Sequence, residues 1–348
     1  MSDWRPTASW ATLHQRARLL AGTRGFFADR DLLEVETPAL IQHAVTDPQL
    51  QNMVVQHQSG QHLFLHTSPE FHMKRLLAAG APDIWQLAKV FRDGEAGRRH
   101  EPEFTLVEWY RHGFSLQQMA EETCALLEQL ARLIADQSNV ARGAPRTAPV
   151  YWSYRQLFQT ALGIDPLGAT AVELENCARK VLGDQCAITT ATRTSTDPGS
   201  ETDDVRLWLD LLMTHVVEQR LAETFLAVIS GYPASQAALA RLDPVDPRVA
   251  ERFEVYLCGI EVANGYRELR DPAEHRQRFA ADRAARLRLG YRDTRPDVDL
   301  IAAIEQGLPD CAGVAVGFDR VLMVLLGLRD IQSAITFPVL PNKPAPRD

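Results

Sequence analysis

The sequence predicts an α+β fold, with an antiparallel β-sheet flanked by helices. Segments with the two-residue alternation of strands predominate at the centre of the chain, and segments with helical periodicity lie before and after them. Strands and helices do not alternate regularly, which argues against a doubly wound parallel sheet. The 348 residues can bury a substantial core, and we expect a single domain over residues 1–348 with a helical insertion at roughly 139–221.

The first elements are predicted from apolar spacing and turn residues. An amphipathic helix is expected first, because apolar residues recur there at helical spacing: Leu13, Ala17, Leu20 and Phe27. LLEVETPAL follows as a short strand that ends at Pro38. MVVQHQ and HLFLH are separated by Ser59-Gly60, a pattern typical of a β-hairpin.

The segment SPEFHMKRLLAAG carries the signals of a helix with defined ends. Ser68 is expected at the N-cap, Pro69 at the first helical position and Glu70 in the first turn, where its charge complements the helix dipole. Gly80 follows the last apolar residue and is expected to end the helix.

Two alternating segments, DIWQLAKVFRD and FTLVEWY, predict a hairpin with a long charged loop. One face of the first strand carries Gln86, Ala88, Val90 and Arg92, and one face of the second carries Phe104, Leu106, Glu108 and Tyr110. The connecting FRDGEAGRRHEPEF is longer than the about two to five residues of most hairpin loops, and such loops are more often functional.

The second half combines helix caps with further strands. Ser115 with Gln118, and Thr170 with Glu173, resemble capping boxes. A linker is expected near 139–149, before the helical insertion. FLAVIS, RFEVYLCGIEV and GVAVGF are predicted strands, and the last leads directly into the apolar helix DRVLMVLLG.

Composition excludes several classes of protein. No apolar run reaches the roughly 18 residues of a membrane span, and MSDWRPTASW lacks the features of a secretory signal. We therefore expect a cytoplasmic protein without a membrane partner. The five cysteines include no CxxC pair, which favours reduced thiols over a disulfide frame or a zinc site. The net charge of −8 argues against a broad nucleic-acid-binding face, but not against ATP, which needs only a few local cations.

Arg92 is the first candidate for chemistry, because a guanidinium on a strand face requires an anionic partner. A structural salt bridge and a bound phosphate both remain open, since the rigid donors of arginine match two phosphate oxygens. Glu108 and Tyr110 on the paired strand would face the same cavity. Tyr110 alone could be a core aromatic, whereas Glu108 needs a partner.

Two further sets of residues lie near the C-terminus. Glu261 and Glu268 bracket Asn264-Gly265, which we expect to form a turn, and a solvated hairpin end is the alternative. In GVAVGFDR, Gly313 and Gly317 would let a flat ligand approach the strand.

Arg320 follows in the helix and could bind a phosphate, although an Asp319–Arg320 charge pair at the helix start remains open. No GxGxxG or GxxxxGK[ST] loop is present in the sequence, so the common parallel-sheet nucleotide sites are not expected. Arginines, carboxylates and glycines on strands together suit ATP, Mg²⁺ and a cationic amine substrate.

These segments resemble a known family. LLEVETPAL, FRDGE…RRHEPEF and GVAVGFDR are similar, in order and approximate spacing, to the three signature motifs of class II aminoacyl-tRNA synthetases. TSPEFHMKRLL, EFTLVEWY and RFEVYLCGIEVANGYREL resemble the lysyl-tRNA synthetases of that class. The resemblance covers about residues 10–340 and implies the class II catalytic fold. No OB-fold anticodon-binding domain is expected, because the chain starts immediately before the first motif.

Ser68 in TSPE, Ala315 in GVAVGFD and the PASQAAL segment resemble the stand-alone paralogues that modify elongation factor P. The resemblance implies an ATP-dependent ligase that activates (R)-β-lysine, or lysine, as an aminoacyl-adenylate and transfers it to a lysine side chain of elongation factor P. ATP and Mg²⁺ are then expected, and tRNA is not. A homodimer is also expected, since the first motif, which ends at Pro38, builds a two-fold interface in this class.

The resemblance also implies the site residues. Arg92 and Arg320 would be catalytic, Arg92 at the α-phosphate and Arg320 at the outer phosphates. The implied ATP-binding set is Arg92, Asp93, Gly94, Glu101, Glu261, Val262, Gly317 and Arg320. The implied substrate-binding set is Ser68, Pro69, Glu70, Tyr110 and Glu268. Glu261 is the candidate Mg²⁺ ligand.

Two alternatives remain open. One is a truncated lysyl-tRNA synthetase that charges tRNA. The other is an inactive paralogue that binds lysine or nucleotide, which the substitutions Gly94 and Glu101 in the second motif keep open.

Overall fold

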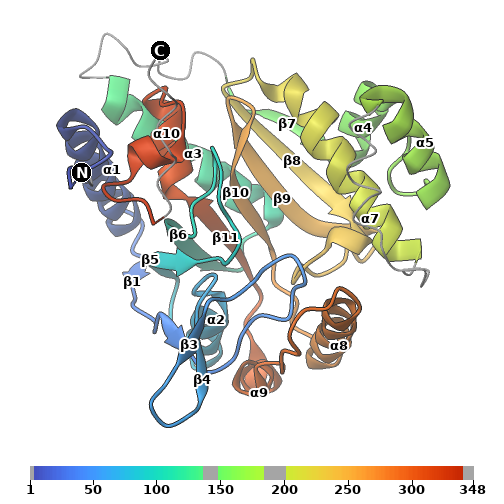
Figure 1. Cartoon of the computed structure of the whole chain (residues 1–348), viewed down its shortest axis with the longest axis horizontal. Helices are drawn as coiled ribbons and strands as arrows, with labels where there is room; N and C mark the ends of the chain where they lie inside the picture. The colour runs from blue at the N-terminus through green and yellow to red at the C-terminus, as the bar shows by residue number, and fades with distance from the viewer. Residues whose placement is uncertain (1–3, 136–147, 184–200, 340–348) are drawn as a thin grey trace. The chain divides into compact units, whose positions relative to one another are not determined.

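The computed structural model describes residues 4–135, 148–183 and 201–339 (Figure 1). The chain divides into two compact units: Met1–Arg146 together with Glu268–Asp348, called unit one, and Thr147–Arg267, called unit two. Most of the expected linker at 139–149 lies outside the described residues, and the single-domain organisation stays a prediction. No helix in the described ranges is long and apolar enough to cross a membrane.

Unit one opens with α1 (Trp10–Ala28), whose N-cap Ser9 accepts a hydrogen bond from the backbone N–H of Thr12. The predicted helix is confirmed, and its predicted apolar face is confirmed in part. Phe27 is completely buried but Ala17 is exposed, and Leu19 and Phe26, which are outside the predicted set, are completely buried as well. The ring of Phe27 stacks on Trp85 at 4.6 Å between centroids.

The sheet of unit one has the order β1-β5-β6-β11. Its strands are β1 (Leu33–Glu34), β5 (Ile84–Phe91), β6 (Glu103–His112) and β11 (Cys311–Gly317). β1 pairs with β5 in parallel, and the other two pairs are antiparallel. The long-loop hairpin of β5 and β6 is therefore confirmed. LLEVETPAL forms only the short β1 and then part of β2.

A second, three-stranded sheet precedes the helix α2. It contains β2 (Leu40–Ile41), β3 (Val54–Gln56) and β4 (His62–Leu65), with β4 in the middle. The β3–β4 hairpin turns at Gly60, whose φ of 82° favours glycine. Both the hairpin and the helix that follows it are confirmed.

α2 (Glu70–Ala78) begins after the SP dipeptide and is followed by Gly80. Pro69 takes the N-cap position, and the hydroxyl of Ser68 accepts a hydrogen bond from the N–H of Glu70. The cap is thus one residue later than predicted. α2 packs against α9 (Val298–Gly307), which in turn packs against α8 (Pro272–Arg288), as Figure 1 shows.

The remaining helices of unit one are α3 (Leu116–Ala135), α10 (Phe318–Leu325) and the 3₁₀ turn η4 (Ile331–Ala334). α3 packs against α1 and β11, and α10 packs against β6 and η4. The predicted capping box before α3 is confirmed, because Ser115 and Gln118 exchange hydrogen bonds between side chain and backbone.

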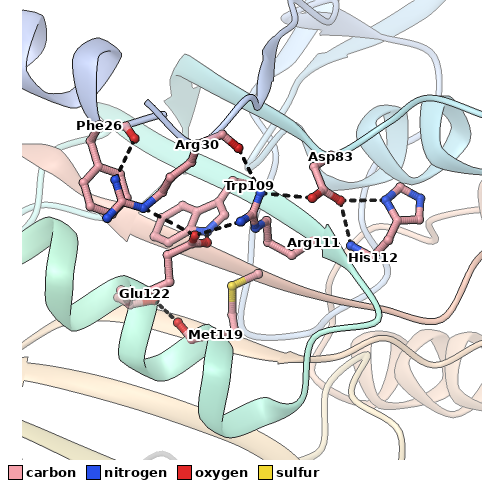
Figure 2. Close-up of polar contacts among 9 residues, drawn as sticks. Phe26, Arg30, Asp83, Trp109, Arg111, His112, Met119 and Glu122 are labelled. Carbon is pink, nitrogen blue, oxygen red and sulfur yellow. Dashed lines mark hydrogen bonds and ion pairs between the residues drawn. The ribbon is translucent and has the colours of Figure 1, made fainter. Parts of the chain in front are cut away.

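A polar network joins β6 to α3 and to the loops around it (Figure 2). Arg111 on β6 forms ion pairs with Asp83 and Glu122, and the indole N–H of Trp109 donates to Glu122. Asp83 also accepts hydrogen bonds from the backbone of His112 and contacts its ring. These contacts fix the end of β6, whose other residues form part of the candidate site.

Unit two contains a sheet with the order β10-β9-β8-β7. Its strands are β7 (Val150–Ser153), β8 (Leu226–Pro233), β9 (Val249–Leu257) and β10 (Ile260–Arg267). Its helical elements are α4 (Tyr154–Leu162), α5 (Ala171–Leu182), α7 (Glu201–Leu212), the π-helical η1 (Met213–Val217), and the 3₁₀ turns η2 (Glu218–Leu221) and η3 (Ala234–Gln236). The capping box of Thr170 and Glu173 at the start of α5 is confirmed.

Two predictions about RFEVYLCGIEVANGYREL are wrong. The segment RFEVYLCGIEV is not one strand, because β9 turns into β10 at Cys258 and Gly259, which have φ values of 50° and 74°. Asn264-Gly265 is not a turn, since both residues lie in β10 and pair with β9. Pairing over the length of β9 satisfies the backbone of β10 and overrides the local Asn-Gly signal.

Candidate active site

A buried lysine between two carboxylates is the central feature of unit one. Lys74 on α2 is completely buried, and its Nζ lies 2.6 Å from Glu70 Oε1 and 2.5 Å from Glu268 Oε2. Glu70 lies one helical turn before Lys74, so the helix itself brings these two side chains together. Glu268 comes from the segment after β10 and is 1% exposed.

Lys74 keeps a charge that its two carboxylate partners stabilise. Burial alone would lower the pKa of Lys74, but the carboxylates of Glu268 and Glu70 outweigh burial and raise that pKa above its usual range. Burial also raises the pKa of Glu268, against the opposing attraction of Lys74. Lys74 therefore keeps its positive charge in the protein interior, as buried charges do when they are paired.

A third carboxyl group, the buried Glu108, lies beside Lys74 and its two partners. The hydroxyl of Tyr110 donates a hydrogen bond to Glu108 Oε1 at 2.7 Å, as expected for neighbours on one face of β6. Burial and the nearby charge of Glu70 raise the pKa of Glu108 to about 8. We call Glu70, Lys74, Glu108, Tyr110 and Glu268 the carboxylate cluster.

Gly313 on β11 leaves room for this cluster. A Cβ atom at Gly313 would lie 2.4 Å from Cε1 of Tyr110 and 2.6 Å from Oε1 of Glu268. The space above Gly313 is thus filled by two side chains of the cluster, and not by the flat ligand that the sequence predicted at this glycine.

The cluster contains three carboxyl groups and one ammonium group. Glu108 is largely protonated at neutral pH, so the negative charge of the cluster only slightly exceeds the positive charge of Lys74. A second ammonium group would neutralise this excess. A site of this kind suits an amine ligand, whose ammonium group would be bound by carboxylates that are already positioned.

Arg92 begins the loop between β5 and β6. Its Nε points to the carbonyl of Thr67 at 3.5 Å, and its NH1 lies 3.3 Å from Glu95. The guanidinium lies over the ring of Phe104. Thr67 directly precedes Ser68, Pro69 and Glu70, so Arg92 contacts the segment that leads into the carboxylate cluster. The salt bridge considered for Arg92 is present, but Arg92 keeps about a quarter of its side chain exposed.

The predicted nucleotide residues Asp93 and Gly94 lie at the start of the same loop. The N–H of Asp93 donates to the carbonyl of Gln51, and Gly94 has a φ of 80°, which favours glycine. Both residues are exposed.

Arg320 on α10 approaches this loop from the other side. Its Nε donates to the carbonyl of Arg99 at 3.2 Å. Burial lowers the pKa of His100, and the charges of Arg320 and Arg92 lower it further. His100 therefore senses the charge of both guanidiniums. Gly317, the predicted adenosine contact, is the N-cap of α10.

The alternative of an Asp319–Arg320 charge pair is wrong. Asp319 is buried and accepts hydrogen bonds from the backbone N–H of Thr105 and from Arg16. Asp319 therefore connects α10 to β6 and α1. Arg320 instead donates a hydrogen bond to the β5–β6 loop.

Glu101, another predicted nucleotide residue, is 2% exposed. Its Oε1 accepts a hydrogen bond from the amide of Gln332 at 2.6 Å. This contact joins the loop to η4, and the predicted ATP contact of Glu101 stays a prediction.

Unit two contains the remaining predicted residues on β10. Val262 is buried, and Glu261 is half-buried beside a polar network of the same unit. In that network Arg252 forms an ion pair with Glu254 at 2.6 Å and donates to the side chain of Asn264. Burial raises the pKa of Glu254, and the charge of Glu261 raises it further. The role of Glu261 as a Mg²⁺ ligand stays a prediction.

The sequence does not predict Lys74 as a site residue, and it indicates Glu108 only as a carboxylate that needs a partner. The spacing of Glu70 and Lys74 by four residues on a predicted helix was an available signal. Lys74 belongs to the site because it also pairs with Glu268, and no local pattern in the sequence connects these two residues.

Comparison with known proteins agrees with this geometry. The family model described as tRNA synthetases class II (D, K and N) matches residues 1–341. The chain belongs to the class II tRNA synthetase family. Among curated relatives, the elongation factor P--(R)-beta-lysine ligases of Vibrio vulnificus (strain YJ016) and Vibrio cholerae serotype O1 are each 44% identical to it, over 97% of this chain and 98% of the relative.

The ligase of the same name from Proteus mirabilis (strain HI4320) is 41% identical, also over 97% of this chain and 98% of the relative. The class II synthetase fold predicted from the motifs is therefore confirmed, with a mixed sheet flanked by helices in place of a purely antiparallel one.

Proposed function

We propose that this class II synthetase family member is an ATP-dependent ligase that activates (R)-β-lysine, or lysine, and transfers it to a lysine side chain of elongation factor P. The observation that carries the proposal is the carboxylate cluster, in which Glu70 and Glu268 pair with one buried ammonium group and Glu108 is held by Tyr110. The names of relatives that span nearly the whole chain support the choice of substrate and acceptor.

A diamino acid suits the cluster because it carries two ammonium groups. Glu268 and Tyr110 would bind the distal ammonium, and Glu70 would bind the amine near the reacting carboxylate. Ser68 and Pro69, which precede Glu70, would contact the same end of the substrate. Lys74 would hold Glu70 and Glu268 in position for this task.

The activation step is a displacement at the α-phosphorus of ATP. The substrate carboxylate attacks, the bond to the β-phosphate oxygen breaks, and pyrophosphate leaves. Arg92 would neutralise charge on the α-phosphate and Arg320 on the outer phosphates, which stabilises the transition state without a protein nucleophile. Asp93, Gly94, Glu101, Val262 and Gly317 are the further proposed ATP contacts. Mg²⁺ would add positive charge at the phosphates, and Glu261 is its proposed ligand.

In the transfer step, a neutral lysine nitrogen of elongation factor P attacks the carbonyl carbon of the adenylate. An amide bond forms, AMP leaves, and the nitrogen loses a proton. Because the attacking lysine must be neutral, its local environment on the acceptor affects the rate.

Pyrophosphate exchange with (R)-β-lysine and with lysine tests the activation step. Exchange that depends on either amino acid is expected, and its absence with both would instead support a non-catalytic binding module. Transfer of labelled amino acid is then measured with elongation factor P and with bulk tRNA as acceptors. Labelling of tRNA, and not of elongation factor P, would identify a tRNA-charging enzyme instead.

A homodimer is part of the same proposal. Leu33 and Leu40, on either side of Pro38, are 51% and 45% exposed, and a two-fold interface at this segment would cover both side chains. Light scattering at micromolar concentration is expected to give twice the mass of one chain, and a monomeric mass would contradict the proposal.

A further inference from the structure

We propose that His43, Asp297 and Asp299 form a binding site for one Zn²⁺ ion, outside the residues of the proposed ligase reaction. One ring nitrogen of His43 and one oxygen of each carboxylate all lie within 4.8 Å of one another. Zn²⁺ binds such atoms at about 2.0–2.2 Å, which places tetrahedral ligands roughly 3.3–3.6 Å apart. Small side-chain rotations can therefore close the three atoms around one ion.

The three ligands come from two segments that are distant in the sequence. His43 belongs to the loop between β2 and β3, and the two aspartates lie at the start of α9. Asp297 is 2% exposed, and its Oδ1 accepts hydrogen bonds from the N–H groups of Asp299 and Leu300, each at 3.0 Å. These two hydrogen bonds hold the carboxylate in one orientation, as hydrogen bonds to metal-binding carboxylates do.

The three residues leave one coordination position free. Zn²⁺ with three protein ligands takes a water molecule as its fourth ligand, which completes the tetrahedral geometry.

Arg75 forms an ion pair with Asp299 where the metal ion would bind. Its NH2 group lies 3.4 Å from Asp299 Oδ2, and more than a third of its side chain is exposed. An exposed pair of this kind contributes little to stability, so Arg75 can move into solvent when a metal ion binds.

The donor set favours Zn²⁺ over Mg²⁺ or Ca²⁺. One imidazole with two carboxylates suits Zn²⁺, whereas Mg²⁺ and Ca²⁺ prefer oxygen ligands alone. The ion would join the β2–β3 loop to α9. Because α9 packs against α2, which carries Glu70 and Lys74, the ion would stabilise a neighbour of the carboxylate cluster.

Calorimetric titration of the metal-free full chain with Zn²⁺ tests the site. Binding of one ion per chain is expected. His43→Gln and Asp297→Asn each remove a ligand and should weaken binding by more than the about tenfold that the loss of a residue supporting a ligand costs. Asparagine is as good an N-cap as aspartate, so Asp297→Asn keeps the helix start while it removes the charged ligand.

Two control variants replace an aspartate and a histidine outside the proposed site. Asp271 caps α8 as Asp297 caps α9, and His14 is exposed on α1, so Asp271→Asn and His14→Gln should leave Zn²⁺ binding unchanged. Titration with Co²⁺ separates this site from the cysteines, because thiolate ligands give an intense near-ultraviolet band. The proposal is overturned by that band at the first equivalent, by the absence of binding, or by equal affinity in all variants.

Discussion

Lys74 Nζ lies 2.5 Å from Glu268 Oε2, and neither side chain is more than 1% exposed. Glu70 holds the same ammonium group from the preceding helical turn. The position of Glu268 is therefore determined by a residue that a substrate need not contact, and a change at Lys74 should affect stability as well as substrate binding.

Lys74→Met should strongly destabilise the protein. The substitution keeps most of the side-chain volume but leaves Glu268 and Glu70 without their cation, and such a loss at a buried pair costs about 3–5 kcal/mol. Urea denaturation of the full chain measures the change in the free energy of unfolding.

The matched control for Lys74→Met is Lys89→Met, because Lys89 also pairs with a glutamate but is about half exposed. An exposed pair contributes about 1 kcal/mol or less. Equal losses of unfolding free energy in the two variants would show that burial of the ion pair is not the cause of the effect at Lys74.

Glu108→Gln should change the pH dependence of stability. The folded state holds the Glu108 proton up to a pKa of about 8, whereas the unfolded chain releases it near the ordinary value of 4.5. The free energy of unfolding thus falls as pH rises between these values, by up to about 1.4 kcal/mol per pH unit, and not above them. Glutamine cannot ionise, so the variant should gain stability relative to the wild type from about pH 5 to pH 8.

Urea denaturation at several pH values between about 5 and 9 provides the measurement. Glu121→Gln, at an exposed position on α3, is the control and should keep the pH dependence of the wild type. If the curves of Glu108→Gln and the wild type stay parallel over this range, the buried acid is not the cause.

Local patterns predicted the elements whose stability is local. The α2 segment has its own cap, first-turn acid and terminal glycine, and the β5–β6 hairpin has a clear alternation on both strands. Local patterns do not predict the structure of segments whose conformation depends on residues distant in the sequence. Asn264-Gly265 is a strong local turn signal, yet β9 pairs with it as a strand.

In the candidate site, too, residues in recognisable motifs are predicted from the sequence, whereas a residue defined by a distant contact is not. The motifs indicated Glu70, Arg92, Tyr110, Glu268 and Arg320, because each lies in a segment with a recognisable pattern. Lys74 resembles any polar residue of a surface helix, since lysine is almost never fully buried unless it is paired. Its burial becomes evident only when Glu268 is placed next to it.

Gly313→Ala should disturb the carboxylate cluster without a change of charge. Its Cβ would overlap Tyr110 and Glu268, and both side chains would have to move. Overpacking of this kind typically costs about 1–3 kcal/mol. In the pyrophosphate exchange assay we also expect a higher KM for the amino acid, with a smaller effect on the KM for ATP.

Gly97→Ala is the control for Gly313→Ala, because a Cβ at Gly97 meets no atom within 4 Å. Its stability and amino-acid KM should stay close to those of the wild type. A crystal structure of Gly313→Ala with Tyr110 and Glu268 unmoved would contradict the steric argument.

Arg92→Ala should reduce activation of the amino acid while the fold stays intact. Arg92 is part-exposed, and its pair with Glu95 contributes little to stability. In the proposed reaction its guanidinium stabilises charge on the α-phosphate, and loss of one such donor typically costs about 10²–10³ in rate. Arg92→Lys should recover only part of this loss, because an ammonium group cannot bind two phosphate oxygens in one plane. Arg98→Ala, at an exposed position of the same loop, should exchange pyrophosphate at nearly the wild-type rate. If Arg92→Ala and Arg98→Ala lost activity equally, the loop as a whole, and not the guanidinium of Arg92, would be responsible.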